Sequence, residues 1–152
     1  MAGDMNLRLM ELAGKGYCCS QIMVLLALDE TGRENPDLVR ASMGLCKGLG
    51  DCSGTCGVYT GAALVLGLYA GKGTDMEAAD VKLPLMLDEL REWFAQTTDP
   101  FGGTTCGAIL DGGECGKPHK ERCGALMDAA SEETRRILVD AGLDPAEGRE
   151  LP

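Results

Sequence analysis

The stretch of sequence that decides the fold is GTCGVYTGAALVLGLYAG, residues 54–71, which carries no charged side chain. Its larger apolar positions recur with the spacing of an α-helix: Val58, Ala62, Val65, Leu66 and Tyr69. Gly57 and Gly61 fall on one face of this helix, where another backbone can approach closely because no side chain intervenes. The stretch therefore predicts a buried central helix that begins near Thr55 and ends at Gly71.

Helices are also expected on both sides of this stretch. A Gly-rich loop, Gly44 to Gly54, precedes the central helix, and Asn35 followed by Pro36 is typical of a helix start. The remaining periodic segments run from Leu7 to Gly14, from Ser20 to Thr31, from Asn35 to about Cys46, from a Thr74-Asp75 cap through Leu83 to Phe94, from Thr105 to Leu110, and from Pro118 to Ala141. Pro84 predicts a kink or a new helix start inside the fourth of these segments.

The fold class follows from these helices and from what is missing. Alternating apolar and polar residues are scarce, and β-branched and aromatic residues are few, so no strand ladder is expected. The sequence predicts an all-α, single-domain bundle of about six or seven helices, with a Gly-rich loop before a central buried helix. We expect this domain to span residues 1–143 and a frayed tail to follow at 144–152.

The net charge excludes several classes of function. The 152-residue chain has 14 Lys and Arg against 24 Asp and Glu, a formal charge of −10. Nucleic-acid backbones and anionic lipid surfaces would repel such a chain, so we expect neither as a partner. The uncharged run at 53–71 is long enough to cross a bilayer, but its Gly, Ser, Thr and Tyr residues make it too polar for a membrane span.

The start of the chain suggests a compartment. Its first residues, MAGDMN, hold neither the basic nor the apolar stretch of a secretory signal peptide, so we expect a cytoplasmic protein. In a reducing cytosol, a cysteine-rich chain is more often redox-active or metal-binding than held together by disulfides.

Eight cysteines and a single histidine are the most unusual feature of the composition. His119 alone cannot build a histidine-based zinc site, and its polar surroundings favour an exposed side chain. No Cys-x-x-Cys pair occurs, so neither a thioredoxin-type dithiol nor a zinc ribbon is indicated. The chemistry that remains is that of sulfur: disulfide exchange, thiolate ligation of a metal, or burial as inert thiols.

Three of the cysteines fall at expected helix starts. Cys19 opens the second helix, Cys56 precedes the central helix, and Cys106 follows the Thr cap of the short later helix. A helix N-terminus offers unpaired N–H groups and a partial positive charge, which favour a thiolate over a thiol. By contrast, Cys46 lies inside the apolar pattern of the third helix and is expected to be inert, and Cys52 is expected in the Gly-rich loop.

Two short segments of the chain resemble each other. They are Gly54-Thr55-Cys56-Gly57 and Gly103-Thr104-Thr105-Cys106-Gly107. Each places a Cys directly after a Thr cap at a helix start. We interpret this likeness as shared chemistry rather than as duplication.

Three parts of the chain, taken in order, resemble one known family. Residues 16–21, GYCCSQ, open the pattern, and residues 54–68, GTCGVYTGAALVLGL, form its centre. Residues 101–110, FGGTTCGAIL, and then Cys123 complete it. The pattern is similar to that of the C_GCAxxG_C_C family of redox-active proteins, and the resemblance covers about residues 12–140.

The resemblance implies a mostly helical domain, a redox role and occurrence in anaerobic prokaryotes. It implies a set of four family cysteines: Cys19, Cys56, Cys106 and Cys123. The chain departs from the family pattern at Gly61, which falls one place late, and at Cys18, which replaces the usual Asn. Three further cysteines look like additions: Cys46, Cys52 and Cys115.

Our favoured hypothesis is electron transfer between thiols and disulfides, which is compatible with a thiol-dependent oxidoreductase. Cys19 and Cys56 would meet in the fold, and Cys106 or Cys123 would resolve the bond that they form. This chemistry requires no cofactor and implies a redox partner protein or a small-molecule electron carrier. The sequence leaves open which cysteine attacks and which resolves.

Two other hypotheses remain. In the first, the same four cysteines hold an iron–sulfur cluster or zinc, with Cys52 and Cys115 as additional candidate ligands. In the second, the chain is a helical interaction protein whose cysteines are simply buried.

Overall fold

The computed structural model describes residues 2–119 and 121–149. Its helices are α1 (Ala2–Gly14), α2 (Cys19–Thr31), α3 (Pro36–Ser42), the 3-10 turn η1 (Met43–Leu45), α4 (Cys46–Leu49), α5 (Gly57–Ala70), α6 (Leu83–Thr98), the 3-10 turn η2 (Asp99–Phe101), α7 (Cys106–Leu110) and α8 (Arg122–Asp140). These residues form no strand, and one isolated antiparallel bridge joins Thr55 to Thr105. The fold is therefore all-α, as the sequence predicts. None of the described helices is long and apolar enough to cross a membrane.

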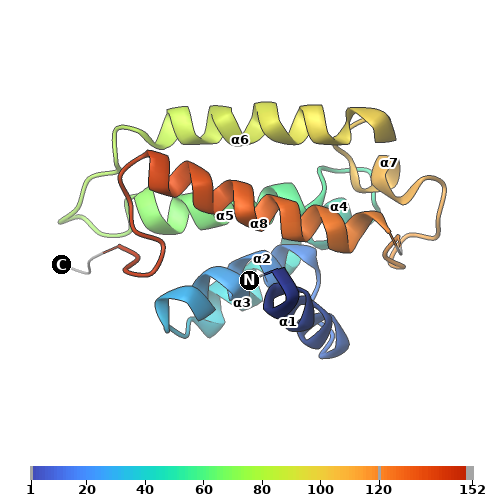
Figure 1. Cartoon of the computed structure of the whole chain (residues 1–152), viewed down its shortest axis with the longest axis horizontal. Coiled ribbons are helices and arrows are strands. Elements are labelled where there is room, and N and C mark those ends of the chain that lie inside the picture. Colours follow the sequence, from blue (N-terminus) through green and yellow to red (C-terminus); the bar gives the residue numbers. More distant parts are fainter. Residues whose placement is uncertain (1, 120, 150–152) are drawn as a thin grey trace.

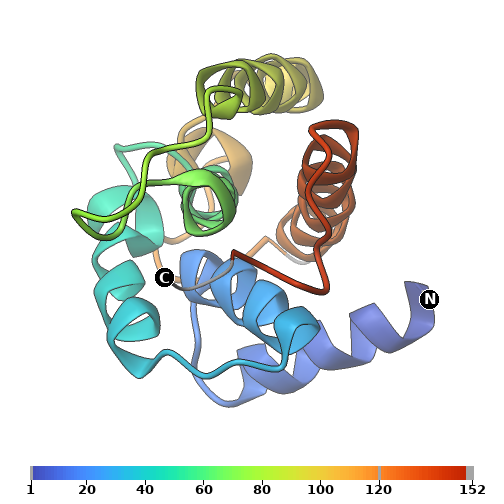
Figure 2. The same cartoon turned by 90° about the vertical axis from the view of Figure 1, so that its left-hand side faces the viewer.

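The long helices run nearly side by side (Figure 1). α2, α5 and α8 point in one direction, while α6 runs the opposite way along α5 and α8. In the view along the helices, α5 lies between α2, α6 and α8 (Figure 2), which makes it the central helix of the bundle. As a consequence, the first turns of α2, α5 and α8 lie towards the same end of the molecule, together with α7 (Figure 1).

Two glycines set the close contact between α5 and α2, as the sequence predicts. A Cβ atom on Gly61 would lie 2.8 Å from Met23 Cβ and 3.0 Å from Ser20 Cα. A Cβ atom on Gly57 would lie 3.3 Å from Cys19 Cβ. The backbones of the two helices therefore touch, and this contact places the start of α2 beside the start of α5.

The third helix is shorter than the sequence predicts. Asn35 caps α3 as expected, with its side chain accepting a hydrogen bond from Leu38 N at 3.1 Å, but the helix ends at Ser42. The chain then turns through η1, so that Cys46 begins α4 instead of continuing α3. The apolar pattern continues past the end of α3 because a 3-10 turn spaces side chains almost as an α-helix does.

The start of α6 also differs in part from the expectation. Thr74 and Asp75 begin no helix, and the chain remains irregular until Leu83. Pro84 lies in the first turn of α6, so it marks a new start rather than a kink. Phe94, on the apolar face of α6, is fully buried.

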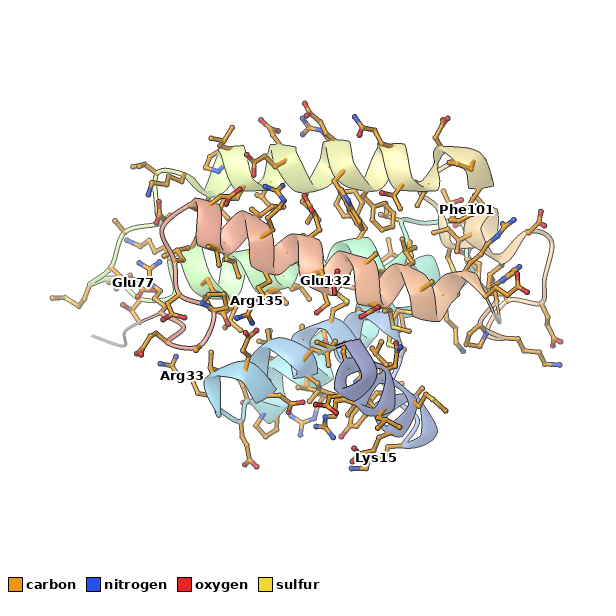
Figure 3. All side chains as sticks on the ribbon, viewed as in Figure 1. Lys15, Arg33, Glu77, Phe101, Glu132 and Arg135 are labelled. Carbon is orange, nitrogen blue, oxygen red and sulfur yellow. A yellow bond between two sulfur atoms is a disulfide. The ribbon has the colours of Figure 1, made fainter. Side chains whose placement is uncertain are left out.

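The described part of the expected tail, residues 144–149, lies against the helices. Tyr69 of α5 donates a hydrogen bond from its hydroxyl to Pro145 O. Arg33 donates to Arg149 O at 3.0 Å, and Arg149 forms an ion pair with Glu77 at 3.1 Å. Figure 3 shows Arg33 and Glu77 at the same end of the molecule, where the chain returns after α8. These contacts hold the segment in place, whereas residues 150–152 lie outside the described residues.

Candidate functional site

Four cysteines that are free in the structure line one cavity of about 320 Å³. They are the four that the family resemblance implies: Cys19, Cys56, Cys106 and Cys123. Cys56 and Cys123 are buried, whereas Cys19 and Cys106 are partly exposed. Helices that are far apart in the sequence thus bring four thiols to a single place.

Each of these thiols lies at the start of a helix. Cys19 is the first residue of α2, Cys56 is the N-cap of α5, and Cys106 is the first residue of α7. Cys123 lies in the first turn of α8. The sequence predicts the first three placements but not the fourth, because the pattern starts the last helix near Pro118, several residues too early.

The two segments that resemble each other in sequence pair with each other in space. Thr55 and Thr105 form the antiparallel bridge. Cys56 N donates to Thr104 O at 2.9 Å, and Cys106 N donates to Gly54 O at 3.0 Å. The reciprocal bonds fix the backbones of the two cysteines side by side, so their likeness reflects one shared structural element.

Gly48 packs against the paired segments around Cys56 and Cys106. Gly54 N donates to Gly48 O at 2.9 Å. A Cβ atom on Gly48 would lie 2.5 Å from Gly54 O and 3.0 Å from Cys106 Cβ. Only a glycine fits at position 48, so the Gly-rich loop packs directly against Cys106 of α7.

Burial dominates the ionisation of the thiols. Burial and, to a smaller extent, the charges of Cys56, Cys123 and Cys106 together raise the pKa of Cys19 to about 12. Burial also raises the pKa of Cys56 to about 11, although the N–H groups at the start of α5 act in the opposite direction. The sequence-based expectation that helix ends would favour the thiolates is therefore wrong, because desolvation outweighs the effect of the amide groups.

The pKa values of the remaining two thiols, Cys106 and Cys123, are raised as well. Burial is the largest cause of the raised pKa of Cys106, and the charge of Cys123 adds to it. Burial likewise raises the pKa of Cys123. The cavity therefore holds its thiols in the protonated state at neutral pH.

The other four cysteines form two disulfides. One joins Cys18 to Cys46 and the other joins Cys52 to Cys115, each with Cα atoms 6.0 Å apart. Cys46 is thus not the inert, unpaired packing residue that the sequence suggests. Cys52 and Cys115, the additional candidate ligands, are engaged with each other and do not line the thiol cavity.

His119 has a structural role that the sequence does not reveal. Its Nδ1 atom accepts hydrogen bonds from Glu121 N and Arg122 N, both at 3.2 Å. Its carbonyl oxygen accepts one from Cys123 N at 3.3 Å. The imidazole therefore caps the start of α8 and helps to place Cys123. A side chain that can accept hydrogen bonds, placed two to three residues before the first turn of a helix, is the sequence signal that could have indicated this capping role of His119.

The described residues contain no group of three or more His, Cys, Asp or Glu side chains placed to hold a metal ion. The four thiols line the cavity from the starts of four different helices.

Comparison with known proteins agrees with this geometry. No curated protein and no solved structure matches the chain. The family described as "Putative redox-active protein (C_GCAxxG_C_C)" matches residues 17–137, a span that includes all four free cysteines. The chain therefore belongs to the C_GCAxxG_C_C family of redox-active proteins.

Proposed function

We propose that the protein transfers electron pairs between thiols and disulfides, with Cys19 and Cys56 as the primary couple. The observation that carries the proposal is the convergence of the four free cysteines on one cavity. Cys106 and Cys123 line the same cavity and provide the resolving thiols.

Two observations support Cys19 and Cys56 as the primary couple. A Cβ atom on Gly57, the first residue of α5, would lie 3.3 Å from Cys19 Cβ, so the neighbouring Cys56 lies close to the start of α2. In addition, Cys56 is the charge that most strongly raises the pKa of Cys19.

The exchange balances in two steps. A thiolate of the couple attacks one sulfur of a substrate disulfide, forms a mixed disulfide and releases the first substrate thiol. The second cysteine then attacks the mixed disulfide, closes the Cys19–Cys56 bond and releases the second thiol. The protein dithiol loses two electrons and two protons, and the substrate disulfide gains both.

The raised pKa values give the couple a resting state. At neutral pH both thiols are protonated and react slowly, because the thiolate is the nucleophile. The N–H groups of Val58 and Tyr59 lower the pKa of Cys56 against the effect of burial. Solvent entering the cavity would weaken the burial effect, so we expect opening of the cavity to activate Cys56 first.

Disulfide mapping tests the proposal. The protein with its two disulfides intact is treated with a small disulfide, alkylated and digested, and the new bonds are located by mass spectrometry. We expect a Cys19–Cys56 bond in the wild type and none in Cys19→Ser. The matched control is the double variant Cys52→Ser/Cys115→Ser, which loses two sulfur atoms outside the cavity and should still form the bond. An unchanged number of free thiols after oxidation would refute the proposal.

The mutual effect of the thiols favours one alternative function. Three other cysteines raise the pKa of Cys19, and a bound cation would neutralise this repulsion among thiolates. Under this alternative, Cys19, Cys56, Cys106 and Cys123 would hold an iron–sulfur cluster or zinc. Anaerobic purification followed by metal analysis and a visible spectrum tests it, and a preparation without iron, zinc or a charge-transfer band would refute it.

A further inference from the structure

The thiol cavity has a local charge opposite to that of the whole chain. The chain has a formal charge of −10. The cavity wall nevertheless includes Lys47 and Lys117, and the described residues that line it include no Asp or Glu. Lys117 pairs with Glu114 at 2.9 Å, but both of these side chains are largely exposed. The remainder of the wall is apolar apart from the cysteines and Tyr17.

Lys47 occupies a backbone conformation that residues other than glycine rarely adopt. Its φ and ψ angles are 57° and 42°, in the left-handed region. The short element α4, which contains Lys47, is therefore not a regular helix, and four more residues of the Gly-rich loop around it have positive φ angles: Gly48, Leu49, Gly50 and Cys52. A strained loop of this kind persists only where its surroundings hold it, and such loops cluster at functional sites.

Disulfides hold this loop at both ends. Cys46, directly before Lys47, is bonded to Cys18, and Cys52 is bonded to Cys115. The Lys47 ammonium lies 3.5 Å from the Cβ position of Gly116, so the side chain reaches across to the segment that carries Lys117. Lys47 forms no ion pair with any described residue. The Lys47 side chain is exposed, so the fold presents its ammonium where the cavity lined by thiols meets solvent.

Two helix ends add to the positive potential. The first turns of α2 and α5 line the cavity, and both helices are more than three turns long. Their N-terminal N–H groups carry a partial positive charge that attracts anions. An apolar, thiol-lined cavity with two lysines and two helix ends is suited to a ligand that combines sulfur with a negative charge.

We propose that the substrate of the cavity is a small disulfide or thiol that carries a carboxylate, which Lys47 binds while the sulfur meets the cysteines. This inference rests on the proposed thiol exchange and names the class of its substrate. The cavity volume of about 320 Å³ suits a small molecule. Lys47 is accordingly a positioning residue, because it touches the carboxylate and not the reacting sulfur.

Three small disulfides of similar length test the proposal by their charge. They are 3,3′-dithiodipropionate, which is anionic, bis(2-hydroxyethyl) disulfide, which is neutral, and cystamine, which is cationic. The rate of oxidation of the cavity thiols is measured with each, and each rate is divided by that of the same disulfide with free 2-mercaptoethanol. We expect the anionic compound to be the fastest and the cationic one the slowest, with the difference shrinking as the ionic strength rises.

The variant Lys47→Gln identifies the source of this preference. We expect it to slow the reaction with dithiodipropionate about fivefold and to leave the neutral disulfide within about twofold of wild type. The matched control is Lys72→Gln, which removes the same charge from the exposed loop after α5 and should change neither rate. Equal normalised rates for all three disulfides, or an equal loss in both variants, would overturn the proposal.

A ligand without sulfur separates this inference from the proposed function. Suberate has the same length and charges as dithiodipropionate but cannot exchange. We expect calorimetry to detect suberate binding to wild type and a loss of about fivefold in affinity in Lys47→Gln. Suberate binding that depends on Lys47 without any disulfide exchange would refute thiol redox chemistry and leave the carboxylate site standing. Exchange without charge preference and without suberate binding would refute the carboxylate site alone.

Discussion

Two opposing physical effects determine the pKa of the Cys56 thiol. The N–H groups of Val58 and Tyr59 stabilise its thiolate, whereas burial destabilises it. Burial has the larger effect and raises the pKa to about 11. A buried thiol of this kind reacts slowly at neutral pH, and we expect its reactivity to depend on how often solvent reaches it.

The pH dependence of alkylation measures this balance. Because the pKa of Cys56 is raised from 9.0 to about 11, the protonated thiol persists as the pH rises, and the thiolate becomes dominant only above pH 11. At pH 8 we expect its reaction with iodoacetamide to be about a hundredfold slower than in the unfolded protein. Peptide-resolved alkylation rates between pH 7 and pH 11 provide the measurement. A rate that levels off below pH 9 would show that the helix end dominates instead.

Gly61 is the second residue whose role can be tested singly. A Cβ atom here would lie 2.8 Å from Met23 Cβ and 3.0 Å from the backbone of Ser20, so α5 and α2 would have to separate. We expect Gly61→Ala to lower the free energy of unfolding by about 1–3 kcal/mol, despite the better helix propensity of Ala. Gly67→Ala is the matched control in the same helix, since nothing lies within 4 Å of its Cβ position. Denaturant unfolding should show the control to be at least as stable as wild type.

At the scale of elements, the start of α8 depends on a single side chain. His119 Nδ1 accepts hydrogen bonds from Glu121 N and Arg122 N, which have no partner inside the helix. We expect His119→Ala to lower the free energy of unfolding by about 1 kcal/mol, and His119→Asn, which can accept similar bonds, to restore most of it. Faster hydrogen exchange at the Cys123 amide in His119→Ala would locate the effect. If Asn and Ala destabilise equally, the imidazole does not act as a cap.

The elements also show what can be predicted from the sequence. Gly57 and Gly61 predict the close contact of α5 because their effect depends only on spacing along one helix. Asn35 predicts the start of α3 for the same local reason. By contrast, the end of α3 at Ser42 and the place of Cys46 depend on how the Gly-rich loop packs, which no local pattern records.

The same distinction applies to the candidate site. The helix starts at Cys19, Cys56 and Cys106 are local features and were predictable. The two disulfides join residues 28 and 63 positions apart, so their pairing depends on the whole fold. The raised pKa values were unpredictable for the same reason, because burial is a property of the assembled cavity. The resemblance between the segments around Cys56 and Cys106 was visible in the sequence, but their pairing required the structure.

At the scale of the whole molecule, the cysteines divide into two sets with different tasks. One set is free and lines the cavity, and the other forms the two disulfides on either side of the Lys47 loop, with Cys18 of this second set also at the cavity wall. The second set ties that loop to the start of α2 and to the segment between α7 and α8. The redox state of the disulfides should therefore control both stability and the placement of Lys47.

Removing each disulfide separates these two effects. Loop-closure entropy predicts losses of about 3.5 kcal/mol for Cys18→Ser/Cys46→Ser and about 4 kcal/mol for Cys52→Ser/Cys115→Ser, because the bonds close loops with separations of 28 and 63 residues. Denaturant unfolding of each double variant and of the wild type, with and without dithiothreitol, provides the measurement. The reductant should destabilise the wild type and leave a variant that lacks both disulfides unchanged.

The first disulfide should also affect the substrate preference. Because Lys47 adjoins Cys46, we expect Cys18→Ser/Cys46→Ser to reduce the preference for the anionic disulfide when the rates are measured without denaturant. If that preference survives, packing of the Gly-rich loop under Cys106 is sufficient to hold Lys47, and the disulfide contributes stability alone.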